Sequence, residues 1–358
     1  MRFALAQLNP IVGDLAGNAE KIVRFTQQAK EAGADLVIFP ELIVTGYPPM
    51  DLLDRPAFLD AVEETVEWLV RELPEGPAVI IGTPVRNRGR SGKRLYNAAL
   101  LIDQGSVQAT ILKRLLPTYD VFDEYRYFEP GPPTQPVEWR GLRLGLHICE
   151  DMWNNEAFAP FLLYDDNPID DLAAQGIDVF VNISASPFER GKQAVRTRIL
   201  RESCCEHDVP FVVVNQTGAN TEVVFDGDSR VHGRHGELLL TTPLFEETLA
   251  FWDMDAPAPA EPLADDEDEL AQVHAALVCG IRDYYHKTGF FDGVLLGLSG
   301  GIDSALTAAL AVEALGPEHV MGITMPSKYS SSGSVDDSQA LADALGIRLE
   351  HVSIRPAV

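Results

Sequence analysis

The chain has 358 residues, of which 46% are apolar, and its 54 acidic against 28 basic side chains give a formal net charge of −26. This length suggests two domains, and the apolar fraction excludes disorder over most of the chain. Binding to nucleic acid or to an anionic membrane surface is not expected, because it needs a basic footprint and no basic stripe is present.

Export and membrane insertion are not expected either. The first ten residues, MRFALAQLNP, lack an apolar core long enough for a signal peptide. The longest apolar runs, at 210–215 and 293–298, are far shorter than the ~20 residues of a spanning helix. Four cysteines without a CxxC pair favour neither a disulfide framework nor zinc. We therefore predict a cytoplasmic protein in which one cysteine can act as a nucleophile.

Residues 1–253 alternate short apolar strands with amphipathic helices. Several strands are apolar throughout, which fits burial beneath helices on both faces, so we predict an α/β sandwich of several layers. Strands are predicted at 2–8, 35–40, 78–82, 97–102, 107–112, 143–149, 177–183, 210–215, 221–226, 237–241 and 248–253. Helices are predicted at 18–32, 56–72, 157–175 and 191–207.

A Pro/Ala-rich, acidic segment at 254–266 predicts a linker to a second domain at 267–358. That domain should contain helices at 267–289, 303–315 and 334–345 and strands at 293–298, 319–325 and 347–354. Three strands joined by two helices form a parallel βαβαβ unit. Because its core is small, we expect either a truncated domain or completion by a partner.

Three reactive side chains follow apolar strands of the first region: Glu41, Lys113 and Cys149. Functional groups often gather at the carboxyl ends of strands, so the three are candidates for one pocket. Together they suit acyl transfer through a thioester, with Glu41 moving protons and Lys113 holding an oxyanion. A helix starting soon after Cys149 would add the N–H groups of Glu150 and Asp151. Taken alone, Glu41 and Lys113 are more typical of surface charges, and Cys149 is more typical of a packed cysteine.

The surrounding motifs resemble the nitrilase superfamily of carbon–nitrogen hydrolases. F-P-E at 39–41 precedes G-Y at 46–47, a lysine precedes L-P at 116–117, and C-E-D stands at 149–151. The resemblance covers residues 1–253 and implies a four-layer α-β-β-α sandwich. It also implies Glu41 as general base, Lys113 as transition-state stabiliser and Cys149 as nucleophile, with Glu124 supporting the lysine.

The run from Leu116 to Phe128 resembles the glutamine-hydrolysing branch of that superfamily, which is fused to NAD synthetases. The residues that this resemblance places around glutamine are Tyr119, Glu150, Trp153, Ser184 and Arg190. Arg190 and Ser184 would lie near its α-carboxylate and α-amino groups. The remaining cysteines are expected to be packed in helices. His147 shares a strand face with Cys149, but side by side on one strand they suit packing better than proton transfer.

In the second region, Ser-Gly-Gly-Ile-Asp-Ser at 299–304 joins a predicted strand to a predicted helix. Its glycines and the helix N-terminus suit a phosphate, and without a following lysine it is not the NTPase P-loop. An acidic Asp303 in such a cradle makes sense if Mg²⁺ lies between it and the phosphates.

The SGGxDS pattern resembles the ATP pyrophosphatases, and the segment from Met325 onward resembles their NAD synthetase branch. An adenine nucleotide α-hydrolase-like parallel-sheet domain is implied, of which only the first part is present. The implied ATP-binding residues are Ser299, Gly300, Gly301, Asp303, Ser304 and Met325, with Asp303 also a metal ligand.

The two resemblances together imply hydrolysis of L-glutamine, with the ammonia passed internally to an ATP- and Mg²⁺-dependent amidation of deamido-NAD, and a homo-oligomeric assembly. Two alternatives stay open. One is a stand-alone amidase carrying a remnant nucleotide-binding domain. The other is a nucleotide-binding regulatory or assembly module in which Cys149 is inert.

Overall fold

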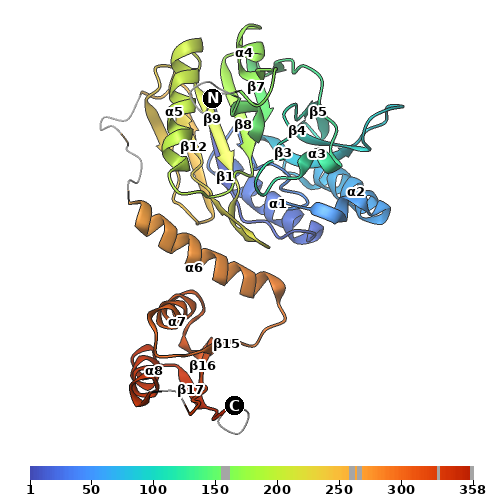
Figure 1. Ribbon diagram of the computed structural model, residues 1–358. Coiled ribbons are helices and arrows are strands. Elements are labelled where there is room, and N and C mark those ends of the chain that lie inside the picture. Colours follow the sequence, from blue (N-terminus) through green and yellow to red (C-terminus); the bar gives the residue numbers. More distant parts are fainter. Residues whose placement is uncertain (155–161, 258–262, 264–267, 329–330, 355–358) are drawn as a thin grey trace. The chain divides into compact units, whose positions relative to one another are not determined.

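The computed structural model describes residues 1–154, 162–257, 263, 268–328 and 331–354 (Figure 1). The chain divides into two compact units, Met1–Gln272 and Val273–Val358. The division lies inside a helix, α6 (Glu269–Thr288). Its first residues, up to Gln272, belong to the first unit, where Gln272 Nε2 donates to Gln193 Oε1 at 3.1 Å. Most of the predicted linker lies outside the described residues.

Two six-stranded mixed sheets form the centre of the first unit. The first has the order β14-β1-β2-β3-β4-β5, with β1 (Arg2–Gln7), β2 (Leu36–Ile38), β3 (Ala78–Arg86), β4 (Leu95–Asp103), β5 (Ser106–Leu112) and β14 (Thr248–Asp253). The second has the order β13-β12-β9-β8-β7-β6, with β6 (Val137–Trp139), β7 (Leu142–Ile148), β8 (Val179–Ser184), β9 (Phe211–Asn215), β12 (Arg230–His232) and β13 (Leu238–Thr241). A hairpin, β10 (Thr217–Asn220) with β11 (Val223–Asp226), stands apart.

The helices of this unit cover the outer faces of both sheets. They are α1 (Leu15–Glu31), α2 (Pro56–Glu72), α4 (Pro168–Ala173) and α5 (Lys192–His207), with the short α3 (Glu124–Tyr127) and the 3₁₀ turns η1 (Met50–Asp54) and η2 (Cys149–Met152). In Figure 1, α1 and α2 lie on the side opposite α5.

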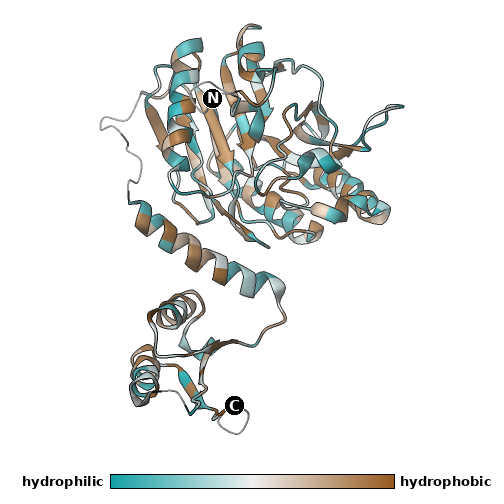
Figure 2. Cartoon of the chain, viewed as in Figure 1, coloured by the Kyte–Doolittle hydropathy of each residue, from teal (hydrophilic) through white to brown (hydrophobic). Residues whose placement is uncertain are grey.

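Strand alternation explains the layers. Phe3 and Leu5 of β1 point into the core between the sheets, whereas Ala4 and Ala6 point toward α1 and α2. On β8, Val181 likewise faces the inter-sheet core, and the neighbouring residue Phe180 faces α4 and α5. Figure 2 shows β8 and β9 as strongly hydrophobic strands. The predicted four-layer α-β-β-α sandwich is confirmed.

The second unit contains a parallel three-stranded sheet. Its strands β15 (Val294–Gly297), β16 (Val320–Thr324) and β17 (Arg348–His351) lie in sequence order and pair in parallel. They alternate with α7 (Ile302–Leu315), the 3₁₀ turn η3 (Pro317–His319) and α8 (Ser332–Leu345). Leu298, Ala308 and Val320 are central to its core. The predicted βαβαβ arrangement is confirmed.

One predicted helix is wrong in part. Residues 162–167 of the expected helix 157–175 are not helical, and 155–161 lie outside the described residues. The helix α4 begins only at Pro168, because the Asn167 side chain caps it by accepting from the N–H groups of Ile169 and Asp170. The short strands β6, β10 and β12, of three or four residues each, were not predicted. No helix among the described residues is long and apolar enough to cross a membrane.

Candidate active site

Lys113 is the centre of a buried cluster between the two sheets. It follows β5, and its Nζ donates to Glu41 Oε1 at 2.7 Å and to both carboxylate oxygens of Glu124 at 2.7 and 2.9 Å. All three side chains are at most 5% exposed. Burial alone would lower the pKa of Lys113, but the two carboxylates raise it well above its usual value. The lysine is therefore a permanent cation, and the predicted association of Glu124 with it is present.

Glu41, just after β2, is held by donors from three directions. Besides Lys113, Asn97 Nδ2 donates to its Oε1 at 2.6 Å, and the Ala185 N–H donates to its Oε2 at 2.9 Å. Asn97 was not among the predicted residues. Its position inside the apolar strand β4 was the available signal, because a buried amide needs a polar partner.

Glu124 opens α3 and joins a third segment to the cluster. Tyr47 donates its hydroxyl hydrogen to Glu124 Oε1 at 2.9 Å. Burial raises the pKa of Glu124 to about 7, although Lys113 opposes the shift. One lysine between two buried carboxylates cannot neutralise both, which is why the effect of burial prevails at Glu124.

Cys149 lies where β7 ends, and its backbone is in the left-handed region with φ 43°. A non-glycine residue there costs of order 1–3 kcal/mol and persists only when its surroundings hold it. The 3₁₀ turn η2 begins at Cys149 itself, which puts the N–H groups of Glu150 and Asp151 in its first turn. Burial and then Glu41 raise the pKa of the thiol well above its usual value, while Lys113 lowers it. The resting thiol is therefore protonated and needs a base.

Asp151 ties the Lys113 and Cys149 segments together. Its Oδ1 accepts from the N–H groups of Arg114 and Leu115 at 3.0 and 2.9 Å, and its Oδ2 accepts from Ile148 at 3.0 Å. Sequence reasoning gave this side chain no role. Burial raises its pKa to about 6, although the three N–H donors stabilise the charge.

A cavity of about 240 Å³ opens onto the cysteine. Ligand pockets for drug-sized molecules are usually larger, so this one suits a small molecule. It is lined by Tyr119, Asp120, Phe122, Cys149, Glu150, Trp153, Ser186, Pro187, Phe188, Glu189, Arg190, Gly191, Lys192 and Val195. Four of the five residues predicted around glutamine are in this set.

Glu150 is the buried carboxylate of the cavity, whereas Asp120 and Glu189 in its lining are exposed. Tyr119 donates to both carboxylate oxygens of Glu150 at 2.9 and 3.0 Å, and Tyr164 donates to Oε1 at 3.0 Å. Burial raises the pKa of Glu150, while Lys113 and the tyrosine hydrogen bonds lower it. Tyr164 was missed because its segment was predicted as helix, where its reach toward Glu150 was not apparent.

The other two predicted glutamine residues differ from expectation in their surroundings. Ser184 is fully buried in β8, does not line the cavity, and donates to Asn182 Oδ1 at 2.5 Å. This placement corrects its expected position: Ser186, two residues further along the chain, lines the cavity instead. Arg190 lines the cavity, but its side chain is 75% exposed and its Nε donates to Glu269 at 2.6 Å.

The remaining cysteines were expected to be packed in helices and His147 to be a packing residue, and the structure agrees except at Cys205. Cys204 and Cys279 are buried and Cys205 is exposed. His147 packs edge-on against Phe180 and Phe211, and burial lowers its pKa to about 4. The histidine is therefore a neutral packing residue.

In the second unit, the 299–304 loop follows β15 and ends in α7. Ser299 and Ser304 hydroxyls lie 3.1 Å apart, and Gly301 N–H donates to Ser299 Oγ at 3.2 Å. Gly300 has φ 76°, and a Cβ there would lie 2.5 Å from the Ser334 carbonyl oxygen. Only glycine fits this position.

The exposed N-terminus of α7 and the exposed carboxylate of Asp303 give this loop donors for phosphate and one oxygen ligand for Mg²⁺. Met325 follows β16, and its Cε lies 3.7 Å from where a Gly297 Cβ would stand. The loop residues thus fit a Mg²⁺-bound nucleotide, whose oxygens would complete the ion's coordination.

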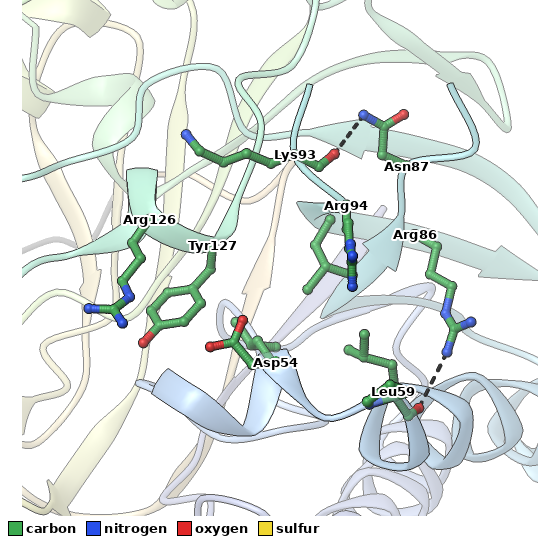
Figure 3. A pocket seen from close by; sticks show the side chains of 11 residues that line it. Asp54, Leu59, Arg86, Asn87, Lys93, Arg94, Arg126 and Tyr127 are labelled. Atoms are coloured by element: carbon green, nitrogen blue, oxygen red, sulfur yellow. Dashed lines mark hydrogen bonds between the residues drawn. The ribbon is translucent and has the colours of Figure 1, made fainter. Parts of the chain in front are cut away.

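A larger cavity of about 460 Å³ lies elsewhere in the first unit, beside α3 and η1 (Figure 3). Arginines and a lysine dominate its charged lining, and it contains neither Cys149 nor the Lys113 cluster. Arg86 at its edge is already paired with Asp60 and Glu63. The cavity that reaches the cysteine is therefore the better candidate for an active site.

Residues 2–258 match the model of the carbon–nitrogen hydrolase family, and residues 273–358 match that of NAD synthase. The chain belongs to the carbon–nitrogen hydrolase family. It is similar to the glutamine-dependent NAD(+) synthetase of Synechocystis, with 46% identity over 99% of this chain and 64% of that protein. The synthetase of Rhodobacter capsulatus is 39% identical over 99% of this chain and 62% of its own length.

Solved structures agree. A glutamine-dependent NAD+ synthetase from Acinetobacter baumannii, in complex with ADP, superposes with a TM-score of 0.89 at 35% identity, covering 99% of this chain and 65% of that one. The NitN amidase from Neterenkonia gives 0.59 at 26% identity, covering 71% of this chain and 92% of that one. The chain thus spans a little under two thirds of the curated synthetases that it matches.

Proposed function

We propose that the protein is a glutamine-dependent NAD synthetase, in which the first unit hydrolyses L-glutamine and the second uses ATP to amidate deamido-NAD. The observation that carries the first half is the buried Glu41–Lys113–Glu124 cluster beside a cysteine that lines a small cavity. The serine- and glycine-rich loop before α7 supports the second half.

On this proposal, Glu41 accepts the thiol proton while Cys149 sulfur attacks the carboxamide carbon. Lys113 and the η2 N–H groups stabilise the oxyanion. The tetrahedral adduct collapses when Glu41 returns the proton to the leaving nitrogen, which departs as ammonia. Glu41 then takes a proton from water, whose oxygen attacks the thioester, and glutamate leaves as the thiol is restored.

In the second unit, Ser299, Gly300, Gly301, Ser304 and Met325 would hold ATP, and Asp303 would share Mg²⁺ with the phosphates. The bound ion would neutralise phosphate charge. Ammonia would then displace AMP from an adenylated nicotinate carboxylate, with pyrophosphate released earlier. A neutral amine is required, and ammonia is mostly ammonium at pH 7, which favours internal transfer.

The same proposal includes a cytoplasmic setting and a homo-oligomeric assembly acting on small molecules. Four cysteines without a disulfide among the described residues suit a reducing compartment. The assembly rests on the resemblance alone, and size-exclusion chromatography with light scattering tests it.

The decisive experiment measures ammonia release from glutamine by the full chain and by Cys149→Ala, with and without ATP, Mg²⁺ and deamido-NAD. Release that disappears in the variant supports the glutaminase half, and NAD formation supports the synthetase half. Amide hydrolysis that ignores ATP and deamido-NAD would favour a stand-alone amidase. Absence of any release would overturn the glutaminase assignment.

A further inference from the structure

A short basic run interrupts this acidic chain. Residues 86–94 (RNRGRSGKR) carry five basic side chains and no acidic one, although the whole chain has a net charge of −26. The run ends β3, forms the turn and leads into β4, and Figure 1 shows this turn projecting from the first unit. So many cations in one turn make it a local attractor for an anion.

The base of this turn is one wall of the 460 Å³ cavity beside α3 and η1 (Figure 3). A cavity of this volume is within the usual range of small-molecule sites. Its lining holds four basic side chains, Arg86, Lys93, Arg94 and Arg126, against one acidic side chain, Asp54. It also holds an apolar part made of Leu53, Pro56, Leu59 and Leu95. The cavity therefore combines an excess of positive charge with apolar surface.

Two of the four cations already have partners. Arg86 is paired with Asp60 and Glu63. The ammonium nitrogen of Lys93 lies 3.0 Å from the centroid of the Tyr125 ring, which covers it. These two side chains add positive charge to the cavity, but they are not the groups that a ligand would contact first.

Arg94 and Arg126 are available to a ligand. Among the residues that the structure describes, no hydrogen bond or ion pair engages the Arg94 guanidinium group. The guanidinium group of Arg126 reaches Asp123 only at 3.8 Å, beyond hydrogen-bond distance. Figure 3 shows Arg126 and Tyr127 on one side of the cavity and Arg86 on the other. Two guanidinium groups with unused donors thus line one cavity.

The first turn of α2 supports an anion at the same place. Pro56 and Leu59 of that turn line the cavity. No side chain caps this 17-residue helix, and its first turn contains no acidic residue. The positive end of the helix dipole therefore adds to the field of the arginines.

We propose that this cavity binds a small organic phosphate, with its phosphate group on Arg94 and Arg126 and its less polar part on the leucines. A guanidinium group matches phosphate because its N–H donors can bind two oxygens at once. An inorganic ion would leave the apolar part of the lining uncovered. The site contains neither Cys149 nor the 299–304 loop, so the inference is independent of the proposed function.

Uridine 5′-monophosphate is the probe, because its base differs from the adenine of the ATP proposed for the second unit. Calorimetry on the full chain should show that it binds at least about tenfold more tightly than uridine or inorganic phosphate. Arg94→Gln and Arg126→Gln should each weaken its binding about tenfold or more, because each removes charge-assisted hydrogen bonds. Both side chains are exposed, so urea unfolding should be unchanged.

Two control variants complete the experiment. Arg88→Gln removes an exposed arginine of the same turn that does not line the cavity, and Gly300→Ala disturbs the loop of the second unit. Binding should be unchanged in both. No binding of the probe by the unmodified chain would overturn the inference. So would an equal loss in Arg88→Gln, which indicates a general effect of charge, or a loss in Gly300→Ala alone, which places the probe in the second unit. Inorganic phosphate that binds as tightly as the probe would overturn the organic part of the assignment.

Discussion

Lys113 Nζ donates to Glu41 Oε1 at 2.7 Å, and this contact joins two residues that are 72 positions apart in the chain. Both side chains are at most 1% exposed. A buried cation that touches the base beside the nucleophile can hold an oxyanion and orient the base at once. Removal of either partner would leave the other as a buried charge without its counterion, which is strongly destabilising.

Replacing Lys113 by Met should abolish ammonia release and destabilise the first unit by about 3–5 kcal/mol, because two buried carboxylates lose their counterion. All four tryptophans, at 68, 139, 153 and 252, lie in that unit, so urea unfolding followed by tryptophan fluorescence reports on it alone. The double variant Lys113→Met with Glu124→Gln should recover part of the stability. Unchanged stability of the single variant would contradict the buried-charge argument.

Asn97→Leu should lower kcat for glutamine by about 10- to 100-fold with little change in KM. The leucine keeps the volume but removes the donor that lies 2.6 Å from Glu41 Oε1, so the base loses its fixed orientation. Steady-state kinetics measures the split. A rise in KM alone would show that Asn97 acts on substrate binding instead.

Asp151→Asn should destabilise the first unit by about 1–3 kcal/mol and reduce activity. Both carboxylate oxygens of Asp151 accept from backbone N–H groups in the unmodified chain. The NH₂ group of an asparagine would replace one of these oxygens and would leave a buried N–H donor without an acceptor. Asp178→Asn is a matched control, because Asp178 accepts from the Arg143 N–H at a more exposed site. Equal destabilisation of the two variants would show that the three-donor arrangement is unimportant.

His147 should make stability fall between pH 7 and pH 5. Its pKa is lowered to about 4 in the folded chain, against 6.5 when unfolded, so only the unfolded state takes up the proton in this window. The stabilisation is complete above pH 6.5 and is lost as the pH falls toward 4, with about 2 kcal/mol gone by pH 5. His147→Leu should lack this component in tryptophan-detected unfolding. An identical pH dependence in the variant would mean that the histidine does not titrate on unfolding.

If the second unit binds ATP as proposed, Gly300→Ala should weaken that binding, measured by calorimetry, at least about tenfold. The residue has φ 76°, and its Cβ would meet the Ser334 backbone at 2.5 Å, so the loop must move away from α8. Gly289→Ala is the control, because Gly289 has φ 64° with open space around it. If Gly289→Ala weakens binding as much as Gly300→Ala does, the loss is due to backbone strain in general and not to the contact with Ser334.

The strand ends and the motifs around Glu41, Lys113 and Cys149 could be read from the sequence, as could the 299–304 loop. These signals are local, because a strand alternates with a period of two and a motif is a short run of residues. The four-layer sandwich followed from the resemblance that these motifs carry. The failure at 162–167 was also local, since the cap at Asn167 and Pro168 outweighed helix periodicity in the preceding residues.

The sequence by itself determined which reactive groups the chain carries and the strand that precedes each of them. Only the tertiary structure decided which groups meet: Asn97 with Glu41 across 56 residues, and Tyr47 with Glu124 across 77. It also placed Ser184 in the interior and Lys192 in the cavity. The physical reason is that such pairs depend on the order and register of strands in two facing sheets, which arise from long-range packing and leave no local pattern in the chain.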